Sequence, residues 1–183
     1  MIDMKELSLH VLDLVQNSLT AGASRVELRV LEDLSANRLT ISVIDNGCGM
    51  TDAQCEAVLD PFVTSRTTRK VGLGLPLFKA AAEQAGGCLI IRSAPGLGTA
   101  VQVEMQHDHL DRAPLGDMAE TLVSILALNE TCRLVYLHIK GAARFEFDSR
   151  EIKDILGEVP PSHPEVVAWL LQYIRENEKS MEV

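Results

Sequence analysis

The most informative segment of the chain is the glycine-rich stretch Asp45-Asn-Gly-Cys-Gly-Met50. It follows directly on an apolar stretch in which Leu39, Ile41 and Val43 alternate with polar residues. That period of two predicts a strand with one buried face, ending at the aspartate. Because glycine has no Cβ, the two glycines that follow predict a turn whose backbone a ligand can approach closely.

A helix is predicted before this unit, from about Lys5 to Thr20, with a regular apolar stripe along one face. His10, Asp13 and Asn17 fall at i, i+3 and i+7, so they form a second face that is entirely polar. Gly22 is placed to end the helix in a left-handed conformation. The helix therefore combines a core-facing stripe with a polar stripe that can carry a site.

Further elements are predicted from periodicity and from turn residues. Ala94-Pro-Gly-Leu-Gly98 reads as the turn of a hairpin. The predicted strands of the first part of the chain are 25–31, 39–45, 88–93 and 100–105, and its shorter helices are 52–59 and 75–85. This layout predicts an α/β (α+β) two-layer sandwich over residues 1–107.

Composition changes after His107, and residues 108–183 are predicted to form a small α/β extension of unknown role. Its expected elements are a helix over 117–128, a hairpin over 133–147, a short helix ending at Gly157 and a last helix carrying Trp169 and Tyr173. Three uses of the last helix stay open: packing on the main domain, forming a dimer, or docking a partner.

Composition excludes several classes of protein. The 183 residues carry 17 Lys and Arg against 26 Asp and Glu, a net charge of −9, which does not suit general nucleic-acid binding. No apolar stretch approaches the roughly 18–20 residues that span a bilayer, so no membrane partner is expected. The four cysteines show no C-x-x-C pair, which favours a reduced, cytoplasmic protein.

Four features stand in one fixed order along the chain: Asn17 on the polar helix face, Asp45-x-Gly-x-Gly49, Gly72-Leu-Gly-Leu75 and Gly98-Thr99. This order resembles the Bergerat-fold (GHKL) ATPase and kinase superfamily, which includes DNA gyrase B, MutL and the sensor histidine kinases. Residues 14–23 look most like the MutL version of its N box, and residues 60–99 look like the lid and glycine boxes of histidine kinases. The resemblance covers about residues 5–105.

The resemblance implies that the chain binds ATP and Mg²⁺. It assigns Asp45 to the adenine amine, for which a carboxylate is a strong acceptor, and Asn17 to Mg²⁺. It places phosphates at the start of the helix that follows Gly72, where free N–H groups and the helix dipole favour anions. The implied ATP-binding residues are Asn17, Asp45, Gly47, Gly49, Met50, Phe62, Arg66, Lys70, Gly72, Leu73, Gly74, Leu75 and Thr99.

Asp13 is the predicted catalytic residue. Hydrolytic members of the superfamily carry a glutamate four residues before the asparagine, and this chain has an aspartate there, one methylene shorter on the same helix face. A general base must reach its water, so ATP hydrolysis, phosphotransfer and binding alone all stay open. The plainer alternatives are a turn cap for Asp45, a solvated basic run over residues 66–70 and an ordinary helix-face role for His10.

The predicted function is that of a cytoplasmic, stand-alone histidine-kinase-like ATPase domain in signal transduction. It would act on a regulatory partner in trans, because the 16 residues before Asn17 leave no room for a phosphoacceptor hairpin. One alternative is a MutL-like or gyrase-like clamp in which ATP drives closure of a homodimer. The other is a degenerate domain that serves only as an interaction module.

Overall fold

The structure is a computed structural model that describes residues 6–60 and 74–181. Its helices and strands agree in type and order with those predicted from the sequence, with ends that differ by one to a few residues. In chain order they are α1 (Leu7–Thr20), β1 (Arg25–Asp33), β2 (Arg38–Asp45), α2 (Asp52–Ala57), α3 (Gly74–Gln84), β3 (Cys88–Ala94), β4 (Gly98–Gln106), α4 (Met118–Leu128), β5 (Arg133–Lys140), β6 (Ala143–Asp148), α5 (Ser149–Leu156) and α6 (Pro164–Ser180).

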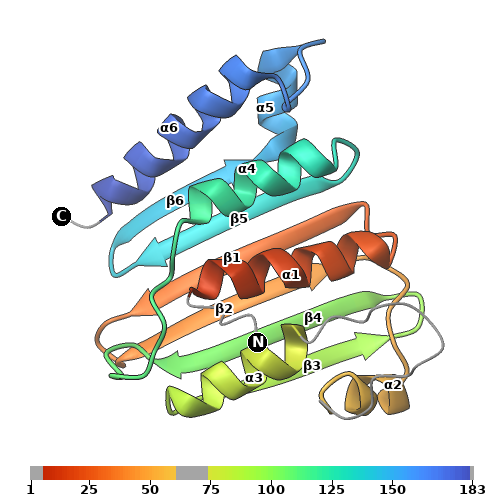
Figure 1. Cartoon of the computed structure of the whole chain (residues 1–183), viewed down its shortest axis with the longest axis vertical. Helices are drawn as coiled ribbons and strands as arrows, with labels where there is room; N and C mark the ends of the chain where they lie inside the picture. The colour runs from red at the N-terminus through yellow and green to blue at the C-terminus, as the bar shows by residue number, and fades with distance from the viewer. Residues whose placement is uncertain (1–5, 61–73, 182–183) are drawn as a thin grey trace.

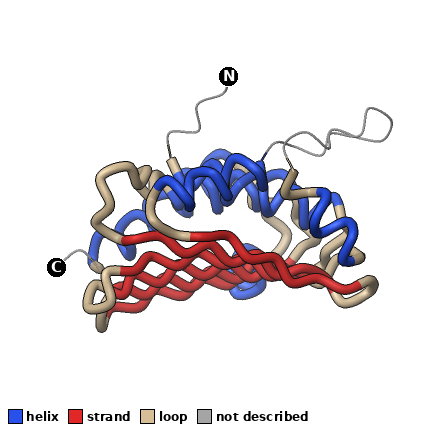
Figure 2. Tube along the Cα trace, turned by 90° about the horizontal axis from the view of Figure 1, so that it is seen from below, coloured by secondary structure: helices blue, strands red, loops and turns tan. Residues whose placement is uncertain are grey.

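The six strands form one mixed sheet in the order β3-β4-β2-β1-β5-β6 (Figure 1). Neighbouring strands run antiparallel except for β1 and β5, which run parallel. The longer helices gather on one side of the sheet (Figure 2). The predicted two-layer α/β arrangement is therefore confirmed.

Helix α1 is central to the helical layer because its apolar stripe is completely covered. Leu7, Val11 and Val15 are each 0% exposed, and they belong to the same core cluster as the inward residues of β2. The alternation noted in the sequence puts Ile41 and Val43 on this inward face, at 1% and 2% exposure. Burial of this apolar surface is the main force that holds α1, and the polar residues it carries, against the sheet.

Residues 108–183 continue the sheet and the core begun by residues 1–107. Strand β5 pairs with β1 along its whole length, from Arg133 opposite Arg25 to Lys140 opposite Glu32. Helix α4 packs on α1, and α6 packs on α4 with three apolar residues buried: Val166, Leu170 and Ile174. Of the three uses left open for the last helix, packing within its own chain is the one seen in the structure.

Truncation after His107 is expected to yield a fragment that does not fold as a soluble monomer. The cut removes β5 from beside β1 and α4 from above α1, which exposes apolar residues such as Leu28 and Val30 that are 0% exposed in the whole chain. Circular dichroism and size-exclusion chromatography of residues 1–107, beside the full chain, test this expectation. A cooperatively folding, monomeric fragment would show that the extension is dispensable.

An ionic network ties the extension to the first part of the chain. The ring of His138 on β5 lies between two carboxylates, with Nε2 2.8 Å from Glu32 Oε1 on β1 and Nδ1 3.3 Å from Glu178 Oε1 on α6. The hydroxyl of Tyr136 donates to the same oxygen of Glu178 at 2.5 Å, and His107 Nε2 lies 2.6 Å from Glu32 Oε2. Hydrogen bonding to His138 lowers the pKa of Glu32 to about 2, although burial opposes the shift. Burial alone would lower the pKa of His138, but its bonds to Glu178 and Glu32 outweigh that effect and raise it.

The network predicts a stability that depends on pH in the acid range. A carboxylate whose pKa falls from 4.5 to about 2 on folding stabilises the protein above pH 4.5 and loses that contribution as the pH drops towards 2. Glu32→Gln should therefore lower the free energy of unfolding at pH 7 by about 3 kcal/mol, with a difference that shrinks below pH 4.5. Urea unfolding of both proteins from pH 7 to pH 3 measures this, and a difference independent of pH would contradict it.

Candidate nucleotide-binding site

The carboxylate of Asp45, at the end of β2, is held by three hydrogen-bond donors. Its Oδ1 accepts from the backbone N–H of Gly47 at 2.8 Å and from that of Thr99 at 3.2 Å. Its Oδ2 accepts from the hydroxyl of Ser18 at 2.7 Å. Each carboxylate oxygen can accept about two hydrogen bonds, so one acceptor position remains, on Oδ2. The side chain is thus fixed in orientation and still able to accept one further donor.

Two glycines let the neighbouring turns contact one another through their backbones. Gly49 has φ +67°, and a Cβ there would lie 2.0 Å from the carbonyl oxygen of Ala94. Gly98 has φ +87°, and a Cβ there would lie 2.0 Å from the carbonyl oxygen of Asp45. Both the left-handed conformation and the close contact exclude larger residues at these positions. The sequence predicts that Gly49 lets a ligand approach the backbone, whereas in the structure the contact with the turn between β3 and β4 already requires a glycine there.

Ser93, at the end of β3, connects the same two turns. Its Oγ accepts a hydrogen bond from the N–H of Met50 at 2.8 Å and lies 2.8 Å from the carbonyl oxygen of Gly98. The hydroxyl of Thr99 is 2.9 Å away. The predicted residues Met50 and Thr99 are therefore joined through one side chain that the sequence analysis did not assign to the site.

Asp13 and Asn17 lie where α1 meets the first residue of α3. Burial raises the pKa of Asp13, and the nearby side chain of Asn17 opposes this shift in part. Asp13 Oδ2 is buried and has no hydrogen-bond partner among the described residues, and a Cβ on Gly74 would lie 1.6 Å from it. Because Gly74 has no side chain, the N-terminus of α3 can lie directly against the Asp13 carboxylate.

His10 occupies the same face of α1 but is enclosed. It is 3% exposed, and its ring stacks on that of Phe78 with centroids 4.7 Å apart and planes within 9°. Burial lowers the pKa of His10, and its Nδ1 has no hydrogen-bond partner within residues 6–60 and 74–181. The polar face expected on α1 is therefore real as a pattern, but His10 packs against Phe78 of α3 and is closed to water, whereas Asp13 and Asn17 are half-buried.

The structure gathers the predicted residues it describes into two adjoining groups. Asp45, Gly47, Gly49, Met50 and Thr99 surround the end of β2, and Asp13 meets Gly74 at the start of α3 with Asn17 nearby. The bond from Ser18, the residue after Asn17, joins the two groups. Leu75 is a buried residue of α3. Five predicted residues lie outside the described residues: Phe62, Arg66, Lys70, Gly72 and Leu73.

The second group has the chemistry expected of a magnesium nucleotide site. Within residues 6–60 and 74–181, no cluster of three or more His, Cys, Asp or Glu side chains could hold a metal ion by itself. Mg²⁺ in nucleotide sites needs only one or two protein oxygens, because phosphates and water complete its shell. The amide of Asn17 supplies such an oxygen, and the carboxylate of Asp13 lies near it. The residues present therefore fit the ion.

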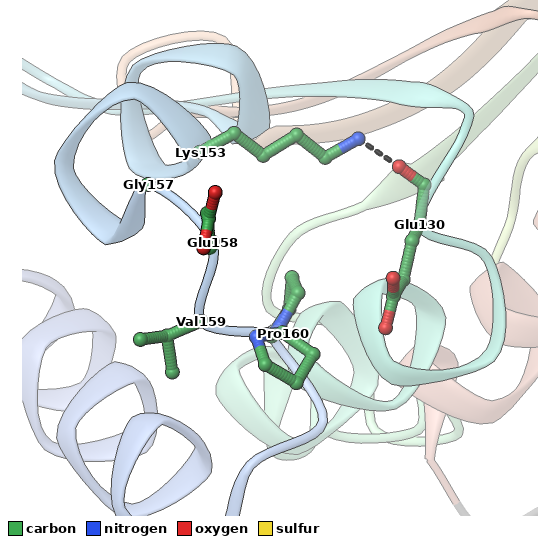
Figure 3. A pocket seen from close by; sticks show the side chains of 7 residues that line it. Glu130, Lys153, Gly157, Glu158, Val159 and Pro160 are labelled. Atoms are coloured by element: carbon green, nitrogen blue, oxygen red, sulfur yellow. Dashed lines mark hydrogen bonds between the residues drawn. The ribbon is translucent and has the colours of Figure 1, made fainter.

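A hollow of about 260 Å³ in the extension is a separate feature (Figure 3). The ammonium of Lys153 points to the carbonyl oxygen of Glu130 and donates a hydrogen bond to it. Its cation is therefore already engaged, and the rest of the lining is the loop Gly157–Pro161. Of the predicted nucleotide-binding residues that the structure describes, none lines this hollow.

Comparison with known proteins identifies the class to which this fold and site belong. Residues 2–109 match the family described as histidine kinase-, DNA gyrase B- and HSP90-like ATPases. The match covers more than half of the chain, and the chain belongs to this GHKL family. The resemblance inferred from the sequence is thereby confirmed.

Individual proteins are similar to this chain over part of its length. The virulence sensor protein BvgS of Bordetella bronchiseptica is 30% identical over 58% of this chain, which spans only 9% of that relative. The N-terminal domain of a DNA repair protein shares the fold over 78% of this chain and 52% of its own, with a TM-score of 0.50 and 16% identity. The MutL ATPase domain of Aquifex aeolicus, solved with ADP, aligns over 78% of this chain and 64% of its own, with a TM-score of 0.49 and 18% identity.

None of the helices in the described part of the chain has the length and apolar character that a membrane span needs.

Proposed function

We propose that this chain binds Mg·ATP at the junction of α1, α3 and the end of β2. The observation that carries the proposal is the Asp45 carboxylate, which three donors hold with one acceptor position left. An adenine ring offers an exocyclic amine as a donor at its edge, and a carboxylate is the strongest acceptor that a side chain can present to it. The base would therefore lie between Asp45 and the turns that contain Gly49 and Gly98.

In this proposal the phosphates lie at the start of α3. The free N–H groups and the dipole of a helix N-terminus favour anions. Asn17 and Asp13 lie against that terminus, where Asn17 would hold Mg²⁺ and the Asp13 carboxylate would accept a proton from an attacking water or hydroxyl group. When bound, Mg²⁺ supplies charge neutralisation for the phosphates.

We further propose that the chain is a regulatory ATPase or protein kinase that acts on a partner protein in trans. His10 supports this proposal because, at 3% exposure and stacked on Phe78, it is not presented to a phosphoryl donor. The free thiols of all four cysteines support a cytoplasmic location. The family membership supports the nucleotide chemistry, and the partner is a protein whose identity the site does not specify.

Substitution of Asn17 tests the magnesium part of this proposal. Asn17→Ala should weaken binding of Mg·ATP by about tenfold, or about 1.4 kcal/mol, because it removes a metal ligand. Binding of ATP in EDTA should change by less than about twofold. Gln16→Ala, on the exposed face of the same helix turn, is the control. Equal losses with and without Mg²⁺ would mean that Asn17 contacts the nucleotide and not the ion.

A further inference from the structure

We infer that Ser18 is a positioning residue for base recognition, and this inference rests on the proposed ATP site. Its hydroxyl orients the carboxylate of Asp45 so that the one free acceptor position, on Oδ2, is directed at the amino group of adenine. Ser18 is thus expected to determine how strongly the site prefers adenine over bases without a donor at that edge.

The bond from Ser18 to Asp45 connects two elements that are distant in sequence. Ser18 is 5% exposed on α1, and its Oγ lies 2.7 Å from Asp45 Oδ2 at the end of β2. A serine inside a helix usually donates to the carbonyl four residues earlier. Here that carbonyl, of Leu14, is the more distant acceptor at 3.3 Å. The shorter bond to a charged acceptor is the stronger of the two, so the hydroxyl proton is directed towards Asp45.

The other two donors to Asp45 differ from Ser18 in kind. Both are backbone N–H groups, of Gly47 and Thr99, and both bind Oδ1. Because both N–H groups bind Oδ1, the Ser18 hydroxyl is the donor that orients Oδ2. The Ser18 hydroxyl is therefore the one side-chain contact among these three, and it is the contact that a substitution can remove without altering the backbone.

Acceptor counting explains why orientation matters for the base. With Oδ1 filled by two N–H groups and Oδ2 half filled by Ser18, the carboxylate presents one lone pair and no donor. Adenine has an amine at the corresponding edge and satisfies that lone pair. Guanine has a carbonyl there, which would set two acceptors against each other in a partly dry site. Without Ser18 the carboxylate gains freedom to rotate, and part of this discrimination is lost.

The test measures binding of two nucleotides to Ser18→Ala by calorimetry. ATP is compared with purine riboside triphosphate, which lacks the 6-amino group. ATP should bind about 3–10-fold more weakly than to wild type, and purine riboside triphosphate should change by less than about twofold. Ser8→Ala, which truncates another buried hydroxyl on α1, is the control and should change neither affinity. Ser18→Cys keeps the volume with a much weaker donor and should behave like Ser18→Ala if the alanine variant folds poorly.

A double-mutant cycle separates positioning from a general structural effect. In the Asp45→Asn background, Ser18→Ala should cause no further loss of ATP affinity, because the group it positions is already altered. Equal losses for both nucleotides, or an additive loss in the Asp45→Asn background, would overturn the inference. If ATP binds wild type and is lost in Asp45→Asn but unchanged in Ser18→Ala, only the role of Ser18 is wrong. Absence of ATP binding to wild type would overturn both this inference and the proposed function.

Discussion

Asp13→Asn is expected to lower ATP turnover by about 10²–10⁴-fold while leaving ATP affinity within about threefold of wild type. The substitution keeps the size of the side chain and removes its ability to accept a proton. Asp13 suits this role because Oδ2 is buried and unpartnered beside Gly74, and because burial raises its pKa towards that of an effective base. Phosphate release under saturating Mg·ATP gives the rate, and calorimetry gives the affinity.

A matched control for this experiment is Glu83→Gln, which neutralises an exposed carboxylate on α3. It should leave both turnover and affinity unchanged. Turnover that persists in Asp13→Asn would show that another group activates the nucleophile. If Asp13→Asn lowered ATP affinity as much as it lowered turnover, Asp13 would contribute to nucleotide binding, by positioning Asn17, and not to the chemical step.

Asp45→Asn is expected to weaken ATP binding by about 10–150-fold, the equivalent of losing a charge-assisted hydrogen bond of about 1.5–3 kcal/mol. The amide of asparagine carries one oxygen and one NH₂ group. Gly47, Thr99 and Ser18 surround the side chain with three donors, so they compete for that single oxygen. An NH₂ group would then face the adenine amine, donor against donor.

The comparison needs an acidic residue that lies outside the site. Asp52→Asn, in the first turn of α2, serves because it changes the net charge by the same amount. It should bind ATP like wild type. Thermal unfolding of each variant shows whether the fold is intact. An Asp45→Asn protein that is folded and binds ATP with unchanged affinity would remove Asp45 from the site.

Local features of the fold were predictable from the sequence because each rests on neighbouring residues. The alternation of apolar and polar residues before Asp45 predicted β2, and the apolar helix face before Gly22 predicted α1. The turn residues 94–98 predicted the hairpin formed by β3 and β4. The polar triplet on α1 was also predictable as a pattern. Its surroundings were not, since the sequence does not show that Phe78 would cover His10.

Contacts between distant segments were not predictable from one sequence. The parallel pairing of β1 with β5 joins residues more than a hundred positions apart, and periodicity indicates only that both are strands. The same holds for Glu32 and His138, which are 106 positions apart, and for the bond from Ser18 to Asp45. For Ser18 one signal was available: it lies next to Asn17 in the polar part of the helix, and a serine within a helix is a candidate for a specific hydrogen bond.

A calorimetric titration of the wild-type chain shows whether the site around Asp45 recognises the adenine of ATP. Mg·ATP and Mg·GTP are titrated in parallel into the same preparation. One ATP should bind per chain, and GTP should bind at least about tenfold more weakly, because guanine presents an acceptor to the Asp45 carboxylate. Equal affinities for the two nucleotides, or no binding of ATP, would contradict this prediction.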